Sequence, residues 1–261
     1  MKTYQNILLE ISKNIATITL NRPEVYNAFN DEQSFELQEV LKLVGKDNEV
    51  RVIIITGAGK AFCSGQDLKS ISGNKERSLA DSLHKRYNPI IRLMRNMPKP
   101  IICKLNGVAA GAGCSLALAS DFIIASTKAS LIEIFINVGL VLDSGSSYFL
   151  PRIVGTQKAF EMATMATKID AQEAMNLGII NRLAEPENLD EETLKIALYY
   201  ANAPTKAIGL MKKMLNKSTY SDLDTMLDYE AYCQEIAGKS DDYKEGVAAF
   251  NEKRPANFTG K

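Results

Sequence analysis

Short β-branched runs separated by longer stretches of helical periodicity are the feature that most constrains how this chain can fold. Three runs in the first half are predicted as strands: Ile15–Leu20, Val50–Ile55 and Pro100–Leu105. Between the first two, Asp31–Val44 has the spacing of an amphipathic helix. Apolar strands that alternate with helices predict an α/β fold with buried strands.

After about residue 157 the strand pattern almost disappears and helical spacing takes over. Five segments are predicted as helices: Ala159–Met165, Ala171–Leu177, Glu191–Ala201, Lys206–Leu215 and Leu223–Ile236. A chain of 261 residues is long enough for one large domain with a helical appendage. A helical C-terminal section is therefore expected.

Charge and residue counts exclude several function classes. Lys plus Arg and Asp plus Glu both number 31, so there is no net basic charge to attract nucleic acid or an anionic membrane. The single histidine, His84, argues against a zinc hydrolase site, and no metal site is expected. Because His84 lies among charged residues, we predict that it is solvated and has no role.

The cysteines and the apolar segments indicate the compartment. Four cysteines form no CxxC pair and have apolar or small neighbours, as buried reduced thiols do. The most apolar region, Ile101–Ser126, is interrupted by Lys104, Asn106 and Asp121, and therefore falls short of a membrane span. No targeting segment is readable. A cytoplasmic protein without membrane contact is expected.

Two stretches rich in small residues follow predicted strands. In Gly57–Leu68 the spacing of phosphate-binding glycine motifs is absent, which disfavours nucleotide binding by those motifs. In Asn106–Ala119 the small residues have two possible roles. They allow close packing of a helix on a sheet, or they place a helix N-terminus against a developing oxyanion.

A third stretch, Asn137–Arg152, carries a single acidic residue, Asp143, between an apolar run and small polar residues. Asp143 is a good candidate for the N-cap of the helix that leads to Pro151. Alternatively, its carboxylate lies at the edge of an apolar pocket, where desolvation raises its basicity. There it can take and return a carbon-bound proton.

Several motifs in a fixed order, spread over essentially the whole chain, resemble the crotonase (enoyl-CoA hydratase/isomerase) family. They are Asn21–Glu24, Ala61–Leu68, Pro98–Pro100, Asn106–Gly113, Gly139–Gly145 and Phe250–Arg254. The resemblance implies a crotonase-like spiral of ββα turns over residues 1–200, as a core for acyl-CoA binding and catalysis. It also implies a C-terminal helical region over residues 201–261 that mediates trimerisation. It also implies an acyl-CoA thioester substrate, no further cofactor, and a homotrimer or a dimer of trimers.

The same resemblance implies roles for individual residues. The family's oxyanion hole falls on the backbone N–H groups of Ser64 and Ala112. Contacts to coenzyme A fall on Ala61, Gln66, Asp67 and Leu68, with Phe250 and Lys253 arriving from a neighbouring subunit. Helix packing for Phe250 and a solvated surface for Lys253 remain open as alternatives.

Departures from the family pattern indicate the branch. The two glutamates that hydratases of the family use fall on Ser115 and Phe135, so both carboxylates are missing. Asp143 stands where isomerases and dehalogenases carry their acid. Glu133 matches no motif position and is predicted to lie on the surface.

Four further segments resemble the branch of ring 1,2-epoxyphenylacetyl-CoA isomerases: Tyr87–Pro89, Val141–Gly145, Asp242–Phe250 and Phe258–Lys261. This resemblance implies an isomerase that forms a thioester enolate. Its reaction would convert 2-(1,2-epoxy-1,2-dihydrophenyl)acetyl-CoA to an oxepin-CoA, with Δ3-to-Δ2 enoyl-CoA isomerisation as a related activity. The alternatives are an enoyl-CoA hydratase and, from another class, a noncatalytic acyl-CoA or RNA-binding protein.

Overall fold

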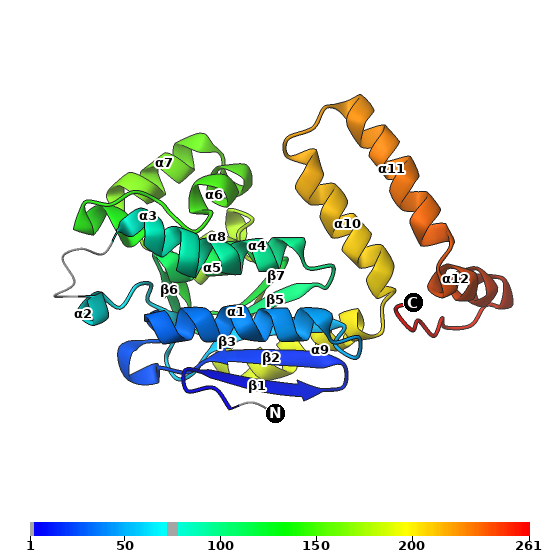
Figure 1. Cartoon of the computed structure of the whole chain (residues 1–261), viewed down its shortest axis with the longest axis horizontal. Helices are drawn as coiled ribbons and strands as arrows, with labels where there is room; N and C mark the ends of the chain where they lie inside the picture. The colour runs from blue at the N-terminus through cyan, green and yellow to red at the C-terminus, as the bar shows by residue number, and fades with distance from the viewer. Residues whose placement is uncertain (1–2, 72–77) are drawn as a thin grey trace.

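The computed structural model describes residues 3–71 and 78–261 and has two sheets within a shell of helices (Figure 1). One sheet has six strands in the order β1-β2-β3-β5-β7-β10, and the other has four in the order β4-β6-β8-β9. The bounds of the strands are β1 Ile7–Ser12, β2 Ile15–Leu20, β3 Val52–Gly57, β4 Ala61–Cys63, β5 Ile101–Leu105, β6 Val108–Ala110, β7 Phe122–Ser126, β8 Ser130–Ile132, β9 Ile169–Asp170 and β10 Arg182–Ala184.

Helices connect the strands and account for most of the second half of the chain. The α-helices are α1 Asp31–Lys46, α2 Leu68–Ile71, α3 Leu79–Ser82, α4 Asn88–Asn96, α5 Ala112–Leu118, α6 Ser146–Val154, α7 Thr156–Met165, α8 Ala171–Asn176, α9 Leu189–Ala201, α10 Thr205–Ser218, α11 Leu223–Gly238 and α12 Asp241–Glu252. Shorter helical turns are η1 Pro23–Val25, η2 Leu83–Tyr87, η3 Ile134–Val138 and η4 Pro186–Asn188. None of the described helices is long and apolar enough to cross a membrane.

The α/β prediction is confirmed, and the topology is a spiral of ββα turns. Successive strands alternate between the two sheets: β3 and β4, then β5 and β6, then β7 and β8. Helices follow each pair, and the next turn pairs in parallel with the previous one, as in the β3–β5 and β5–β7 pairings. This arrangement brings the ends of β4, β6 and β8, and the loops that follow them, to one side of the small sheet.

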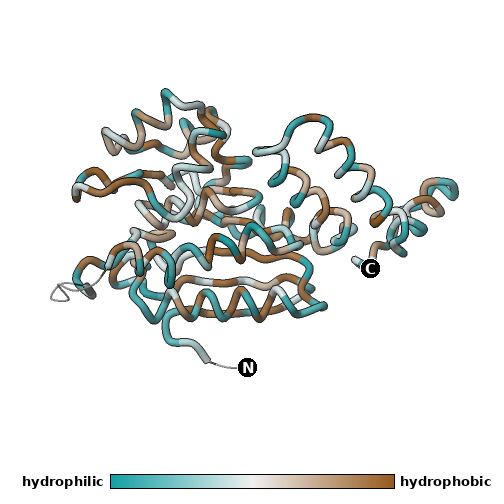
Figure 2. Tube along the Cα trace, turned by 45° about the horizontal axis from the view of Figure 1, so that its top comes forward, coloured by the Kyte–Doolittle hydropathy of each residue, from teal (hydrophilic) through white to brown (hydrophobic). Residues whose placement is uncertain are grey.

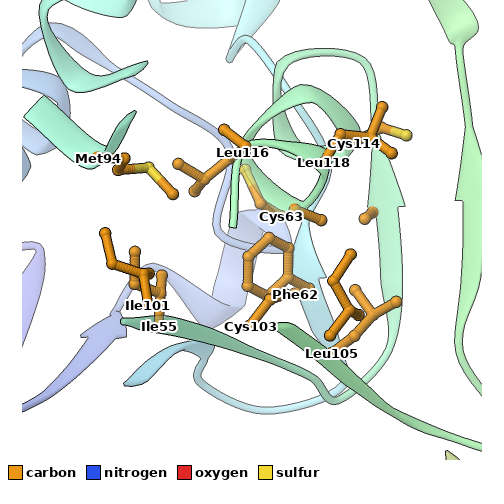
Figure 3. Packing of buried hydrophobic residues seen from close by; sticks show 14 of the residues in the cluster. Ile55, Phe62, Cys63, Met94, Ile101, Cys103, Leu105, Cys114, Leu116 and Leu118 are labelled. Atoms are coloured by element: carbon orange, nitrogen blue, oxygen red, sulfur yellow. The ribbon is translucent and has the colours of Figure 1, made fainter. Parts of the chain in front are cut away.

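The core lies between the sheets and against the helices that cover them. Figure 2 shows long hydrophobic runs along the strands and alternating hydrophobic and hydrophilic segments along the helices, which is the pattern expected for buried strands and half-buried helices. Figure 3 shows Phe62 of β4 packed among buried side chains from β5 and α5. All four cysteines are buried and free, as predicted, and burial raises the pKa of the Cys63 thiol to about 12.

The last helices leave the spiral and extend to one side (Figure 1). Polar contacts hold α10 to the spiral: the buried Lys212 ammonium donates to the carbonyls of Met94 and Lys99 and to Asp121 Oδ2 at 2.6 Å. Helix α9 ends at Ala201, close to the predicted boundary. The division into a core and a separate helical region remains a prediction.

Candidate active site

A cavity of about 350 Å3 opens where the loops after β4, β6 and β8 meet. Apolar side chains form most of its wall, and few polar groups face it. The lining residues come from the segment after β4, from α3 and η2, from the start of α5, and from residues 134–143. A largely apolar cavity with a few polar groups is the usual form of a small-molecule site.

The loop after β4 forms one side of the cavity and corrects one prediction. The Ser64 N–H already donates to the Tyr26 carbonyl at 3.0 Å, so it is not available to a substrate oxygen. By contrast, the Gln66 N–H, two residues on, makes no hydrogen bond within the described part of the chain. On this loop the free backbone donor is therefore the N–H of Gln66 rather than that of Ser64, and Gly65 between them has φ +94°.

The side chain of Gln66 is held away from its own N–H. The Tyr87 hydroxyl donates to Gln66 Oε1, and Gln66 Nε2 donates to the Phe29 carbonyl at 2.8 Å. Phe29 and Tyr87 also meet edge to face, with ring centroids 5.6 Å apart. These contacts fix the backbone around Gln66 and keep the side chain from satisfying the free amide.

The N-terminus of α5 lies directly beside this loop. Ala112 is the first residue of the helix, and amides in the first turn have no partner within the helix. A Cβ placed on Gly65 would be 3.5 Å from the Ala112 nitrogen and 2.9 Å from the Ala110 carbonyl oxygen. The structure therefore brings the Gln66 and Ala112 segments together at the cavity, and only glycine fits between them.

Asp143 also lines the cavity, from a turn before α6. Burial raises the pKa of its carboxyl, and the hydrogen bond from Ser144 Oγ to Oδ1, at 2.7 Å, opposes that rise. Helix α6 begins at Ser146 with Gly145 as its N-cap, and no side chain caps it. Capping therefore does not explain Asp143, and the cavity is left with a carboxylate of increased basicity.

The positions where hydratases carry glutamates contribute no acid to the cavity. Phe135 lines it with an apolar ring, while the Ser115 side chain is buried behind it. Among the described residues that line the cavity, Asp143 is the one carboxylic acid. Among the described lining residues, acid–base chemistry by a side-chain carboxyl therefore falls to Asp143.

Glu133 is not on the surface, and that prediction is wrong. Its side chain is fully buried just before η3, where Oε1 accepts a hydrogen bond from Ser146 Oγ at 2.8 Å. Burial raises the pKa of this carboxyl to about 7. A glutamate between Ile132 and Ile134 gives no periodic signal that distinguishes a buried position from an exposed one, and its polar partner is 13 residues away.

The four residues within positions 61–68 that are predicted to contact coenzyme A separate into three groups. Gln66 and Leu68 line the cavity, and Leu68 is exposed at its rim. The Asp67 carboxylate is instead paired with Arg22 at 2.9 Å. Ala61 is buried in β4, and its carbonyl accepts a hydrogen bond from Asn27 Nδ2, so the structure does not bring Ala61 to the cavity.

Phe250 and Lys253 lie at the end of α12, far from the cavity of their own chain (Figure 1). Both are exposed, and 84% of the Phe250 surface is accessible. Neither residue lines the cavity of its own chain. His84 is exposed on η2 and does not line the cavity, as predicted.

Comparison with known proteins defines the class. The family model for enoyl-CoA hydratase/isomerase matches residues 10–261, and the chain belongs to this family. It is 41% identical over 258 residues to the 1,2-epoxyphenylacetyl-CoA isomerase of Escherichia coli K12, with 98% of each chain covered. It is also 34% identical over 262 residues to the crotonyl-CoA hydratase of Syntrophomonas wolfei, with 99% of each chain covered.

Solved structures agree with this assignment. The crystal structure of the enoyl-CoA hydratase from Bacillus anthracis matches the fold with a TM-score of 0.93 and 32% sequence identity. The match covers 98% of this chain and 100% of that one. The protein is therefore a crotonase-fold acyl-CoA isomerase or hydratase.

Proposed function

We propose that this protein is an acyl-CoA isomerase that forms a thioester enolate, with Asp143 as its acid–base group. The proposed substrate is 2-(1,2-epoxy-1,2-dihydrophenyl)acetyl-CoA, which would give an oxepin-CoA, with Δ3-to-Δ2 enoyl-CoA isomerisation at the same site. The 41% identity to the Escherichia coli epoxyphenylacetyl-CoA isomerase supports the substrate. The apolar cavity wall suits an aromatic or alkenyl acyl group.

The geometry supports a reaction in which one carboxylate moves a proton. For a 3-enoyl-CoA, the Asp143 carboxylate takes a proton from C2, and the electron pair spreads over the thioester as a dienolate. The N–H groups of Gln66 and Ala112 would hold the thioester oxygen as it gains charge. Asp143 then returns the proton to C4, which leaves the double bond between C2 and C3. The reaction needs no cofactor besides the coenzyme A of the substrate.

The observation that carries this proposal is that Asp143 is the single carboxylic acid on the described cavity wall. Hydration requires one group to activate water and a donor to protonate the α-carbon. Ser115 and Phe135 supply neither, although one relative is named a crotonyl-CoA hydratase. A noncatalytic acyl-CoA or RNA-binding role would leave unexplained why a carboxylate is kept partly desolvated at this position.

The test is to incubate the protein with a small panel of CoA thioesters and to identify the products by their absorbance and mass. A 3-enoyl-CoA should be converted to its 2-enoyl isomer with no change of mass, and the ring epoxide should likewise give an isomer. Crotonyl-CoA should not gain the mass of water at an appreciable rate. Rapid formation of 3-hydroxyacyl-CoA would contradict the proposal and identify a hydratase.

The proposed assembly is a homotrimer or a dimer of trimers in the cytoplasm, in which the last helices pack against another subunit. Several apolar side chains of α11 and α12 are exposed, which is typical of a surface that forms an interface with another chain. They are Leu223, Leu227, Tyr232, Val247 and Phe250. In that assembly Phe250 and Lys253 would reach coenzyme A bound to a neighbour. Light scattering should give a multiple of three chains, and a stable monomer at micromolar concentration would contradict the assembly.

A further inference from the structure

A second carboxylate lies behind the turn that carries Asp143. Glu133 follows β8 and is fully buried. Its Oε1 accepts from Ser146 Oγ, whereas Oε2 accepts no hydrogen bond from the polar atoms of the described residues. The thiol of Cys114, a weak donor, is its other neighbour. Burying an ionisable group with so few partners is unfavourable, so packing alone is a poor explanation for Glu133.

A chain of two hydroxyls connects Glu133 to the backbone of Asp143. Ser146 Oγ lies 2.8 Å from Ser115 Oγ. Ser115 Oγ in turn lies 3.1 Å from the Asp143 carbonyl oxygen. Both serine side chains are fully buried, so water does not compete for these contacts. Three elements that are distant in sequence, namely β8, α5 and α6, therefore meet at the base of the Asp143 turn.

The protonation state of Glu133 sets the direction of this chain. When Glu133 is ionised, the Ser146 hydrogen points to Oε1, and Ser146 Oγ is free to accept from Ser115. When Glu133 is protonated, it can donate to Ser146, which then donates to Ser115. The Ser115 hydrogen then has two carbonyl acceptors, Asp143 at 3.1 Å and Gly111 at 3.3 Å, and the contact with Asp143 is the shorter. The hydrogen bond from Ser115 to the Asp143 carbonyl, which anchors the Asp143 turn, is therefore strongest when Glu133 carries its proton.

The Asp143 turn needs such an anchor because its backbone is strained. Ser144 has φ +50° and Gly145 has φ +89°, and a left-handed conformation is unfavourable for serine. Among the described residues, the Asp143 carboxyl accepts one hydrogen bond, from the neighbouring Ser144 hydroxyl. A small relaxation of the turn would change how the carboxyl faces the cavity, and proton transfer is sensitive to such changes.

We propose that Glu133 is a positioning residue for Asp143, acting through Ser146 and Ser115 to hold the turn that aims the Asp143 carboxyl into the cavity. This inference rests on the proposed function of Asp143. Glu133 does not line the cavity, so it takes no part in the proton transfer itself.

The neighbours of Glu133 define the pH range in which its effect should appear. Its pKa is raised to about 7, mainly by burial, and the nearby charge of Asp143 contributes to the rise. The other titratable neighbour is Cys114, whose pKa is raised well above its usual value, so it remains a thiol at neutral pH. Around pH 7, Glu133 is therefore the group behind the turn that changes charge.

Two variants and a matched control separate positioning from general packing. Ser146→Ala breaks the chain but keeps the carboxylate, and Glu133→Gln keeps the shape but does not ionise. Ser147→Ala is the control, because Ser147 is the next residue of α6 and is exposed. The kcat and KM for a 3-enoyl-CoA would be measured across neutral pH for these variants, for the unaltered protein and for Asp143→Asn.

Positioning predicts that Ser146→Ala lowers kcat by about 10- to 100-fold while KM is unchanged. In the unaltered protein, kcat should fall as the pH rises through about 7, because Glu133 loses its proton there. Glu133→Gln should lack this fall in kcat and should keep the decrease at lower pH that follows protonation of Asp143. Ser147→Ala should behave as the unaltered protein. If Glu133→Gln fails to fold, Ser146→Ala alone decides between the outcomes.

The results also distinguish failure of this inference from failure of the proposed function. If Ser146→Ala and Glu133→Gln retain the kcat and pH profile of Ser147→Ala while Asp143→Asn is inactive, positioning by Glu133 is overturned and the proposed function stands. An equal loss in Ser147→Ala would also overturn it, because the effect would then be general damage to α6. If Asp143→Asn remains active, the proposed function itself fails.

Discussion

The two sides of the cavity present different chemical groups: backbone N–H groups on one side and side chains on the other. The donor wall, residues 64–66 with the start of α5, offers backbone N–H groups that glycines at positions 65 and 111 bring together. The carboxylate wall, residues 133–146, offers side chains: Asp143 at the cavity, and Glu133 and Ser146 behind it, where Ser146 contacts Ser115 of α5. One wall is set by the path of the chain and the other by the identity of its side chains.

This difference indicates where the reaction type is encoded. A backbone donor works with almost any side chain, so the donor wall can stabilise an enolate in hydratases and isomerases alike. The carboxylate wall determines which proton moves and whether water can be activated. We therefore expect substitutions of side chains to have small effects on the donor wall and large effects on the carboxylate wall.

The largest effect is expected for Asp143→Asn. Asparagine keeps the shape of the side chain but cannot take a proton, so turnover of a 3-enoyl-CoA should fall by roughly 10²–10⁴-fold. Binding of the thioester and the melting temperature should change little. Near-normal turnover by protein whose identity has been checked by mass would remove Asp143 from the mechanism. The expectation that side chains matter more on the carboxylate wall than on the donor wall would then fail.

On the donor wall, only loss of an amide should matter. Ala112→Pro removes the N–H at the first position of α5, where proline is otherwise well tolerated. It should lower kcat by about 10²–10³-fold, which is typical for loss of one oxyanion donor. Ala112→Gly keeps the N–H and is the matched control, with activity close to normal. Equal activity of the two variants would show that the Ala112 amide does not hold the substrate oxygen.

The buried Glu133 should make stability depend on pH. Its folded-state pKa of about 7 lies above the ordinary value of 4.5, so its contribution is present at low pH and is lost as the pH rises through 7. Relative to Glu133→Gln, the unaltered protein should lose on the order of 3 kcal/mol of unfolding free energy as the pH rises from 4.5 to about 7. Denaturant unfolding at several pH values measures the difference. A gap between the two proteins that does not vary with pH would contradict the buried charge.

The smallest effect is expected for Ser64→Ala. The Ser64 N–H is bonded to the Tyr26 carbonyl, and its hydroxyl makes only a long contact of 3.3 Å with the Val25 carbonyl. Activity should remain within about twofold of normal, as for surface-like substitutions. A loss as large as that of Ala112→Pro, without a loss of stability, would contradict this and would show that the Ser64 side chain takes part in the reaction.

Much of this arrangement could be predicted from the sequence, because it depends on local patterns. The predicted helix at residues 31–44 is α1, and the run at residues 15–20 is β2. Asp143 was a candidate because it is an isolated acid between an apolar run and a turn. These features depend on neighbours a few residues away, where periodicity and turn chemistry are informative.

Other parts of the site depend on contacts that no local pattern encodes. The pairing of Ser115 with Ser146 spans 31 residues. Whether the amide of Ser64 or of Gln66 is free depends on the direction of the backbone after Gly65, and side-chain identity gives no information about it. The burial of Glu133 is hidden from a local pattern for the same reason, because its hydrogen-bond partner Ser146 lies 13 residues away in α6.

The central claim is that the Asp143 carboxylate removes a proton next to the thioester carbonyl. Hydrogen exchange at C2 of phenylacetyl-CoA in D2O tests this step directly, because the ring and the thioester both acidify these hydrogens and there is no double bond to move. The unaltered protein should exchange them for deuterium, seen as a mass increase, while Asp143→Asn should bind the thioester without exchange above the uncatalysed rate. Equal exchange by the two proteins would contradict the account.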